Sequence, residues 1–430
     1  MSKIDLRITA LHKARSIIIL SPDYDLDADS FSIKTCLAIK GLEQGPRADC
    51  SIVGEIKFKS NLEAAELVGE GRVSWIMAED LVNRLIVQSC RQGGLSGVFS
   101  DLLDFEGSEI YLLDSPEIIG ITFHQANLRL SKSVAIGVIN ADVVKLNPPQ
   151  DYVLVSGDQL VVLAEDETEL HLESKPIDVD SSAIVAKPHK LNDLDSTLIL
   201  GVNRGVELLL EELDSSSKKG SKVTLIASEA EIRPGQYRNL DFHVIHQDPT
   251  IKQVLIDADV TKYNHIVILA ARDCDVQKAD AKTLLCLLHV RALTKDLDIN
   301  IVSEILDDHN RELIETERSD DFIVSDKLVS HAISQISENS HLYPVFEKIF
   351  SGTAQHIRLK PISNYVATDQ QVSFNEVIEA ASRAGESAIG YRSLALQSEA
   401  GELHGVRLNP SRSEKFSFSP GDSVISVCND

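Results

Sequence analysis

The feature that most constrains the fold of this chain is an internal duplication. Residues 16–39 (SIIILSPDYDLDADSFSIKTCLAI) resemble residues 265–288 (HIVILAARDCDVQKADAKTLLCLL), and SIVGEI at 51–56 resembles NIVSEI at 300–305, both at an offset of 249 positions. Two further matches follow in the same order: GVFSDLLDFEGSEIYL with PVFEKIFSGTAQHIRL, and KLNPPQDYVLVSGDQ with RLNPSRSEKFSFSPGD. Segments that repeat in order with a slowly drifting offset indicate duplication, so we expect both units to share one fold.

The second unit contains every element of that fold and therefore indicates its class. Five apolar runs are separated by helical patterns such as VELLLEEL, and they occupy residues 196–201, 222–227, 241–246, 265–270 and 300–305. Continuous apolar strands separated by helices predict a parallel sheet covered on both faces. We therefore predict an α/β chain of tandem Rossmann-like lobes, each followed by a small α+β lobe.

The repeat also predicts the domain boundaries. We expect a partial Rossmann-like lobe with crossover helices at 1–107, a small C-terminal lobe at 108–170, a linker at 171–195, a Rossmann-like lobe with crossover helices at 196–350, and a second small lobe at 351–430. The first Rossmann-like lobe is expected to be N-terminally incomplete, because residues 6–15 align with the helix before the fourth strand. This predicts that the chain is a piece of a longer protein.

Composition excludes several classes of protein. The chain has 42 basic and 66 acidic side chains, a formal net charge of −24, which disfavours binding to nucleic-acid phosphates. We find no apolar run of about 18 residues, and the start of the chain lacks the apolar core of a secretory signal. Six cysteines without a CxxC pair indicate neither disulfides nor zinc. We therefore expect a cytoplasmic chain without a transmembrane segment.

Several segments resemble the cytosolic region of CASTOR/POLLUX-type ion channels, which is a tandem pair of RCK (regulator of K⁺ conductance) domains. They are EDLVNRLIVQSCRQGGLSGVFSDLLDFEGSEIYL, KLNPPQDYVLVSGDQLVVLAEDE, LGVNRG, AIGYR and RLNP. The resemblance implies a non-enzymatic gating-ring module in which four chains form a ring of eight RCK domains. It also implies a ligand such as Ca²⁺, a position at the inner face of a membrane, and a pore domain upstream or on a separate chain.

The loop SPDYDLDADS is the candidate cation site. It places Asp23, Asp25, Asp27 and Asp29 at alternate positions after a strand, and Glu55 at the end of the next strand completes the candidate set. Hard divalent cations bind several carboxylate oxygens. The loop is not an EF-hand, since Ala28 and Lys34 replace the glycine and the bidentate glutamate of that motif. The competing interpretation is that Asp27, Asp29 or Ser30 caps the following helix.

The second unit keeps a looser counterpart of these acidic residues. Its members are Asp273, Asp275, Asp280 and Glu304. Because their spacing is less regular, the second unit provides weaker support for a Ca²⁺ site.

The turn LGVNRG follows the first strand of the second unit, where a dinucleotide fold has G-x-G-x-x-G. Gly201 matches the first glycine, but Asn203 and Val206 occupy the positions of the other two. NAD binding is therefore disfavoured. Another nucleotide or a phosphate at this helix N-terminus, paired with Arg204, stays open.

No catalytic signature accompanies these folds, since HExxH, G-x-S-x-G and Walker A motifs are all missing. Two alternatives to the gating module remain: an NAD(P)-dependent oxidoreductase using the second unit, and a soluble RCK-type regulatory subunit of a separate transporter.

Overall fold

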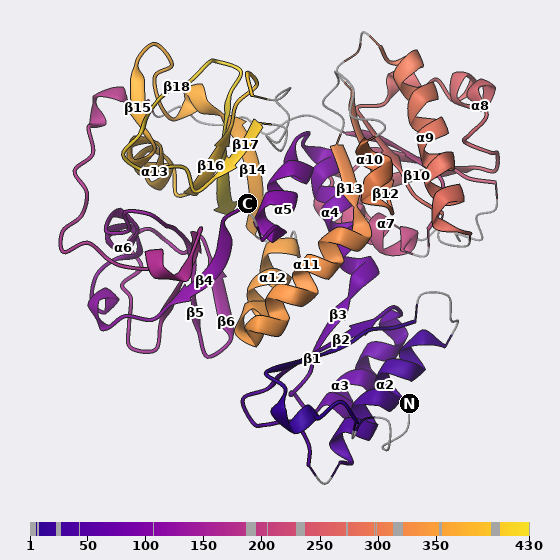
Figure 1. Ribbon diagram of the computed structural model, residues 1–430. Coiled ribbons are helices and arrows are strands. Elements are labelled where there is room, and N and C mark those ends of the chain that lie inside the picture. Colours follow the sequence, from indigo (N-terminus) through magenta and orange to yellow (C-terminus); the bar gives the residue numbers. More distant parts are fainter. Residues whose placement is uncertain are drawn as a thin grey trace.

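The computed structural model of the 430-residue chain (Figure 1) contains two parallel sheets and two small lobes with a group of helices between them. It describes residues 6, 8–22, 27–42, 44–105, 107–185, 195–203, 205–228, 237–271, 274–295, 297, 299–312, 321–351, 355–396 and 405–429. Short 3-10 helices join the larger elements: η1 (Leu11–Lys13), η2 (Lys59–Asn61), η3 (Pro116–Ile118), η4 (Glu167–Glu169), η5 (Ser181–Ala183), η6 (Val260–Lys262), η7 (Ser340–Leu342) and η8 (Ile362–Asn364).

The first Rossmann-like lobe has a three-stranded parallel sheet. Its strands β1 (Ser16–Ile19), β2 (Ser51–Ile56) and β3 (Ser74–Met77) lie in that order, with α2 (Ala28–Lys40) and α3 (Leu62–Gly69) packed beside them. Gly54 is required in β2, because a Cβ there would lie 2.2 Å from the ring of Trp75. Trp75 is buried in the core between the sheet and these two helices.

The second Rossmann-like lobe has a six-stranded sheet in which every pairing is parallel. The strand order is β10 (Leu240–Ile245), β9 (Ser221–Ile226), β8 (Ser196–Leu200), β11 (His265–Ile268), β12 (Asn300–Ile305) and β13 (Asp321–Val324). Its own helices are α7 (Val206–Ser216), α8 (Lys252–Asp257), α9 (Val276–Leu293) and α10 (Asp308–Glu312). Strand order reverses between β8 and β11, which confirms the doubly wound topology expected from the uninterrupted apolar runs.

Each small lobe is a four-stranded antiparallel sheet with a helix. The first has the order β4 (Glu109–Leu113), β7 (Gln159–Ala164), β5 (Val134–Asn140), β6 (Val143–Leu146) and the helix α6 (Phe123–Leu128). The second has the order β14 (Gln355–Pro361), β19 (Ser423–Asn429), β16 (Ser387–Arg392), β17 (Val406–Leu408), with α13 (Phe374–Arg383) and a separate pair β15 (Gln371–Ser373) and β18 (Lys415–Ser417).

Both small sheets carry a register shift at equivalent glycines. The shift lies beside Gly137 in β5 and beside Gly390 in β16. A Cβ at either position would lie within 3 Å of a backbone carbonyl oxygen on the neighbouring strand. The duplication therefore extends to local irregularities of the backbone.

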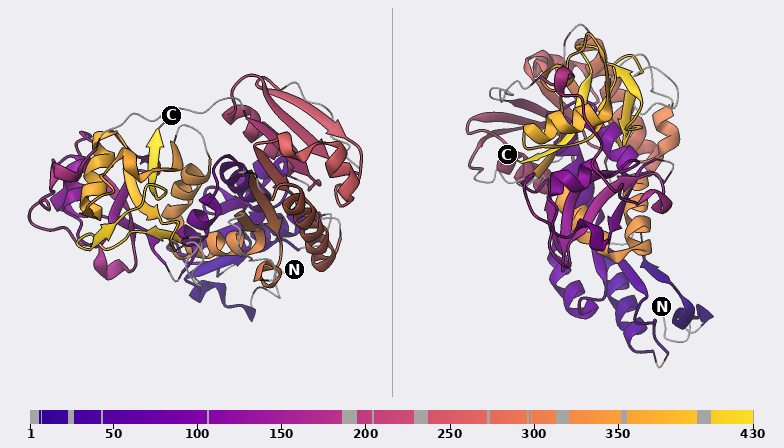
Figure 2. Two further views of the ribbon diagram at one scale, coloured as in Figure 1. Left: turned by 90° about the horizontal axis from the view of Figure 1, so that it is seen from above. Right: turned by 90° about the vertical axis from the view of Figure 1, so that its left-hand side faces the viewer.

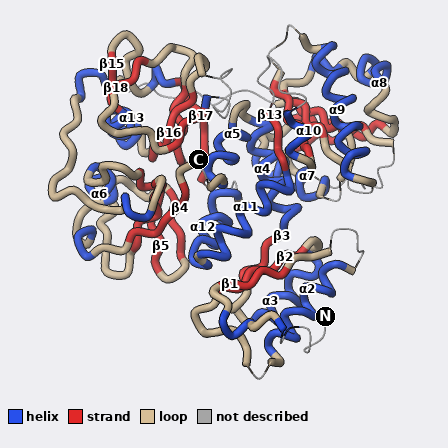
Figure 3. Tube along the Cα trace, viewed as in Figure 1, coloured by secondary structure: helices blue, strands red, loops and turns tan. Residues whose placement is uncertain are grey.

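The crossover helices are exchanged between the units. In the first unit they are α4 (Ala78–Arg91) and α5 (Leu95–Leu103), and in the second they are α11 (Ser325–Glu338) and α12 (Tyr343–Phe350). Helix α4 packs on β11, β12 and α7 of the second unit, whereas α11 packs on β1 and β2 of the first. Figure 3 shows these helices at the centre of the chain. Each unit thus completes the core of the other.

The views in Figure 2 show the same arrangement from two other directions. The first Rossmann-like lobe, which contains β1, β2 and β3, extends at one end of the molecule, away from the second small lobe. Within the described part of the chain, no helix is both long and apolar enough to cross a bilayer.

Candidate functional site

The carboxyl ends of β1 and β2 are joined by Glu55. Its Oε2 accepts a hydrogen bond from the backbone N–H of Ser21 at 2.9 Å, and its backbone oxygen accepts one from the Ser21 hydroxyl at 3.0 Å. The hydroxyl of Ser32 in α2 lies 2.9 Å from that of Ser21. Glu55 therefore lies at the edge of the sheet where parallel α/β folds bind ligands.

Asp29 holds the chain that leaves β2. Its carboxylate accepts hydrogen bonds from the backbone N–H groups of Lys57 (2.8 Å) and Phe58 (3.0 Å) and from the Asn61 amide (2.8 Å). The side chain is 1% exposed. Because three donors converge on this buried carboxylate, Asp29 has a structural role in the first turn of α2.

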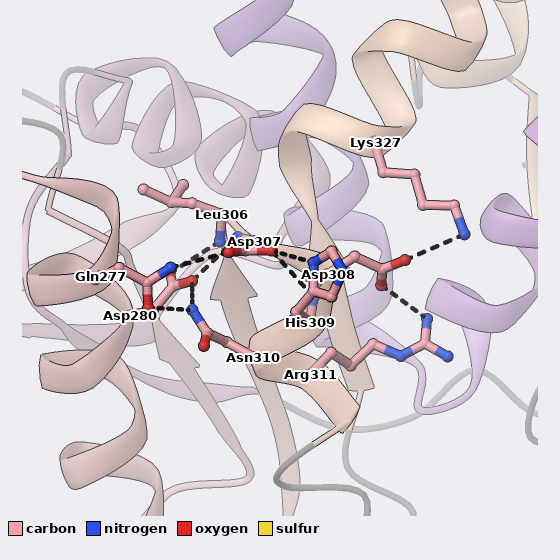
Figure 4. Close-up of polar contacts among 9 residues, drawn as sticks. All are labelled: Gln277, Asp280, Leu306, Asp307, Asp308, His309, Asn310, Arg311 and Lys327. Carbon is pink, nitrogen blue, oxygen red and sulfur yellow. Dashed lines mark hydrogen bonds and ion pairs between the residues drawn. The ribbon is translucent and has the colours of Figure 1, made fainter.

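Asp280 makes the same set of bonds in the second unit (Figure 4). Its oxygens accept from the N–H groups of Leu306 (2.9 Å) and Asp307 (3.0 Å) and from the Asn310 amide (2.8 Å), and the residue is fully buried. Asp29 and Asp280 are 251 positions apart. The offset of 249, which holds for the strands, is therefore wrong by two residues in this helix, because α9 begins earlier: Asp280 is the fifth residue of α9, whereas Asp29 is the second residue of α2.

The residues beside Asp280 form a surface network that reaches the first unit. Asp307 accepts hydrogen bonds from the backbone N–H of His309 and from the Gln277 amide, and the His309 contact lowers the pKa of Asp307. Lys327 lies 3.4 Å from Asp308 and 3.8 Å from Asp104, which follows α5 of the first unit.

The remaining helix-start acids differ between the units. Asp275 caps α9, since its Oδ1 accepts from the N–H groups of Gln277 (2.8 Å) and Lys278 (3.4 Å). Asp27 precedes α2 but makes no such cap, and its carboxylate instead accepts from the Ser30 hydroxyl. Asp23, Asp25 and Asp273 lie outside the described residues.

Glu304 is buried beneath the glycine turn of the second unit. Its Oε2 accepts from the Asn203 amide (3.0 Å) and from the N–H of Ala270 (2.9 Å), while Oε1 accepts from the Ser325 hydroxyl (3.2 Å). Glu304 is 1% exposed. A carboxylate surrounded by donors in this way supports the turn from below and is directed away from solvent.

The glycine turn itself is closed by side chains. Gly201 has φ +86°, and a Cβ there would lie 2.9 Å from the oxygen of Leu269. The Oδ1 of Asn203 accepts from the N–H of Gly205 at 3.0 Å, and a Cβ at Gly205 would lie 1.8 Å from the amide of Asn83 in α4. The approach to the start of α7 is thus limited by α4. Arg204 lies outside the described residues.

A cavity opens between the two units at this edge of the sheets. Its empty space is about 1250 Å³, including solvent at its mouth, and Glu55, Glu79 and Asp326 contribute carboxylates to its wall. Glu79 and Asp326 occupy matching positions at the starts of α4 and α11, 247 residues apart. We define this site as the inter-unit cavity. Sequence reasoning missed Glu79 and Asp326, although both follow a strand in the repeated pattern.

Among the described residues, no group of three or more His, Cys, Asp or Glu side chains has a geometry suited to a metal ion. Asp29, Asp280 and Glu304 are engaged by backbone and amide donors, as described above. The Ca²⁺ site stays a prediction that depends on Asp23 and Asp25 together with Glu55.

Comparisons with known proteins match two different family models to two parts of the chain. Residues 79–180 match the family model described as "Castor and Pollux, part of voltage-gated ion channel", and residues 197–325 match the TrkA-N domain. The chain is 26% identical over 437 residues to the probable ion channel CASTOR of Oryza sativa subsp. japonica, covering 90% of this chain and 48% of that protein. It therefore spans about half the length of this relative.

Two further matches are more distant. The calcium-gated potassium channel TvoK of Thermoplasma volcanium is 27% identical over 175 residues, or 39% of this chain and 49% of that one. The human SLO3 gating ring superposes with a TM-score of 0.71 at 14% identity, covering 100% of this chain and 90% of that chain, which is a likeness of fold. These relatives are ion channels and not enzymes.

Proposed function

Because this chain belongs to the CASTOR/POLLUX family of ion channels and carries RCK (TrkA-N) domains, we propose that it is the ligand-sensing gating module of a CASTOR/POLLUX-type cation channel. The observation that carries the proposal is the inter-unit cavity, whose wall includes Glu55 of the first sheet and Asp326 of the second unit. A ligand there touches both units at once.

The gating mechanism that we propose is a population shift. A ligand changes the balance between two arrangements of the units only if it binds one of them more tightly. The exchange of α4 and α11 supports this mechanism, since movement of either helix alters the packing of the other unit's sheet. The resulting displacement would act on a pore domain that lies upstream or on a separate chain.

We propose Ca²⁺ as the ligand. The acidic loop that contains Asp23 and Asp25 precedes α2, and the loop's strand ends next to Glu55. Clustered carboxylates repel one another unless a cation neutralises them. The relative TvoK is named as calcium-gated, which supports the same class of effector. Asp273 and Asp275 form the corresponding candidate group of the second unit.

We propose that four copies assemble into a closed ring of eight RCK domains, the arrangement that the resemblance to RCK gating rings implies. The proposed domain boundaries remain those of the repeat, with a junction in residues 171–195. A soluble regulatory subunit of a separate transporter would have the same ring, and it differs from the channel module only in where its pore is encoded.

The test is light scattering and calorimetry of the purified chain, first with EDTA and then with millimolar Ca²⁺. We expect a tetramer that binds Ca²⁺, and an Asp23→Asn/Asp25→Asn double variant that does not. Asp241→Asn is the matched control, because Asp241 is exposed on β10, outside the inter-unit cavity. A chain that stays monomeric and indifferent to Ca²⁺, or a double variant that binds it unchanged, would contradict the proposal.

A further inference from the structure

We propose that a cavity at the outer edge of β3 binds a small organic cation, which is an ammonium group attached to an apolar body. Strand β3 ends the three-stranded sheet, and β2 is its one neighbour among the described strands. Beside the outer edge of β3, the wall of the cavity is completed by α3, α4, β6, α11 and α12. We call this space the edge cavity. Its empty space is about 1240 Å³, including solvent at its mouth, which is ample for a small molecule.

The edge cavity is distinct from the inter-unit cavity, although the same two crossover helices line both. In α4, Leu81 lines the edge cavity and Val82 lines the inter-unit cavity. In α11, Ile336 lines the edge cavity and Ile333 lines the inter-unit cavity. A ligand in the edge cavity therefore contacts both exchanged helices without occupying the site that contains Glu55.

The two copies of the repeat differ at the junction where the edge cavity lies. At the junction of β13 with α5, the carboxylate of Asp321 accepts hydrogen bonds from the N–H of Gly94 (2.7 Å) and the hydroxyl of Ser96 (2.6 Å). At the junction of β3 with α12, Ser74 and Tyr343 occupy the matching positions, each 247 residues from its counterpart. The carboxylate that joins strand to helix in one copy is therefore missing in the other.

The phenol of Tyr343 lies in the wall of the edge cavity beside more acceptors than it has protons. Its oxygen is 2.9 Å from the backbone oxygen of Trp75 and 3.0 Å from the Oε1 of Glu347. Burial raises the pKa of Tyr343, and the charge of Glu347 raises it further, so the phenol stays neutral. Because a tyrosine hydroxyl carries one proton, it cannot donate fully to both acceptors. A ligand with several N–H donors would satisfy the second acceptor.

Ion pairs account for part of the charge in this wall. Arg84 lies 2.8 Å from Asp80 and 3.7 Å from Glu212 of α7, so its charge is already offset by carboxylates. Asp142 lies 3.6 Å from His341, which offsets the carboxylate only when the histidine is protonated.

A negative charge remains after these pairs are removed. Glu66 of α3 and Glu347 of α12 both line the edge cavity, and neither has an ion-pair partner among the described residues. Lys348 is the second cation of the wall and can offset one of these two carboxylates. The wall therefore keeps at least one carboxylate without a cation. A concave site with one sign of charge raises the local concentration of ligands of the opposite sign.

Aromatic side chains provide the apolar part of the wall. Phe346 and Phe350 of α12 stack with ring centroids 5.6 Å apart, and Trp75 and Tyr343 lie in the same wall. Aromatic rings bury apolar groups and attract ammonium ions through their π-systems. The described acidic residues do not form a group suited to a metal ion. The wall therefore favours an organic cation over a hydrated inorganic one.

The experiment is calorimetric titration of the full chain with 2-phenylethylammonium at low salt. EDTA is present, so that the outcome does not depend on Ca²⁺. Neutral 2-phenylethanol is the matched probe, because it has the same apolar body without the charge. We expect saturable binding of the ammonium ion and about tenfold weaker binding of the alcohol, the difference typical of one charge-assisted hydrogen bond.

Variants of the wall test where the cation binds. Glu66→Gln/Glu347→Gln should weaken binding of the ammonium ion about tenfold and leave binding of the alcohol unchanged. Glu63→Gln/Glu338→Gln is the matched control, because it removes two exposed carboxylates from α3 and α11 outside the edge cavity. Val144→Phe narrows the cavity without changing its charge, so it should weaken binding of both probes. Thermal unfolding without ligand reports whether each variant folds.

Several outcomes would overturn the assignment. They are an absence of saturable binding at millimolar 2-phenylethylammonium, equal affinities for the ammonium ion and the alcohol, and equal losses in the control pair. Binding that survives Glu66→Gln/Glu347→Gln and is lost in Glu55→Gln would also overturn it, since the cation would then occupy the inter-unit cavity. Titration of Glu66→Gln/Glu347→Gln with Ca²⁺ should match that of the unaltered chain, which separates this site from the proposed Ca²⁺ site.

Discussion

Gln88 and Gln335 make the same hydrogen bond in opposite directions across the boundary between the units. The Nε2 of Gln88 in α4 donates to the oxygen of Phe350, the last residue of α12, at 3.1 Å. The Nε2 of Gln335 in α11 donates to the oxygen of Leu103, the last residue of α5, at 3.0 Å. Each amide therefore donates to a carbonyl at the end of another helix, where the last carbonyls have no partner within that helix.

From this pair of hydrogen bonds we predict that two substitutions lower the free energy of unfolding by similar amounts. Gln88→Met and Gln335→Met should each lower the free energy of unfolding by about 1 kcal/mol, because a buried carbonyl loses its donor. Urea titration followed by circular dichroism measures both. Gln253→Met is the control, since Gln253 lies on the exposed surface of α8 and its loss should cost less than about 0.5 kcal/mol. A neutral result in both core variants would show that these bonds do not hold the units together.

For the buried carboxylates Asp29 and Asp280, we predict that substitution lowers stability without removing a ligand of Ca²⁺. Asp29→Asn and Asp280→Asn should each cost about 2–3 kcal/mol of stability, since a charge-assisted acceptor facing backbone N–H groups is lost. Thermal and urea unfolding test this, with the exposed Asp27→Asn as the control. If Asp29→Asn instead unfolds like the unaltered chain and loses Ca²⁺ binding, Asp29 is a metal ligand and its structural assignment is wrong.

For the asparagines of the repeated Leu-Asn-Pro segments, we predict that glycine and alanine substitutions lower stability to different extents. Asn147 and Asn409 have φ values of +41° and +43°, and their amides donate across the small lobes to the oxygens of Gly385 (2.8 Å) and Lys132 (2.9 Å). Glycine at either position removes the hydrogen bond of the amide but adopts the left-handed backbone without strain. Alanine removes the same hydrogen bond and also strains the backbone, because its Cβ disfavours a positive φ. We expect alanine to cost about 1 kcal/mol more than glycine, measured by urea unfolding. Equal costs would mean that the backbone conformation is not strained.

Asp101 predicts a pH dependence of stability. This carboxyl of α5 lies beside β17. Burial raises its pKa to about 6, although a hydrogen bond from the backbone of Leu408 acts in the opposite direction and lowers the pKa. A folded state that holds its proton more tightly than the unfolded state is stabilised at low pH, and that contribution is lost as the pH rises through about 6. Asp101→Asn should therefore raise stability at pH 7 to 8 by up to ~3 kcal/mol and flatten the profile between pH 4 and 7.

The measurement is urea unfolding of both forms across that pH range. Asp104→Asn is the comparison, since it removes a neighbouring carboxylate without removing the buried one. An unchanged pH profile in Asp101→Asn would show that this carboxyl does not titrate on its own in the folded chain.

Sequence patterns predicted the architecture well, because each strand buried on both faces appears in the sequence as an uninterrupted apolar run. The uninterrupted apolar runs that became β8, β9 and β11 required two covered faces, and the six-stranded parallel sheet confirms this. The pattern did not predict which unit covers which face. That information lies in contacts such as those of α4 with β12, which join residues more than two hundred positions apart.

The candidate site was less accessible to sequence reasoning. From the sequence, Asp29 is a possible cation ligand or helix cap and Asp280 a possible cation ligand, because the spacing of acidic residues along a loop does not distinguish these roles. Their actual partners are backbone N–H groups beyond the next strand, which no local pattern specifies.

The exchange of crossover helices has a consequence for the history of the chain. In a protein with only one such unit, the crossover helices would project and one sheet face would be uncovered unless a second copy supplied its helices in exchange. The duplication places both partners of this exchange in one chain. Once they were covalently joined, the two halves no longer had to remain identical, and the starts of the matching helices differ accordingly: Asp275 caps α9, whereas Asp27 makes no such cap on α2.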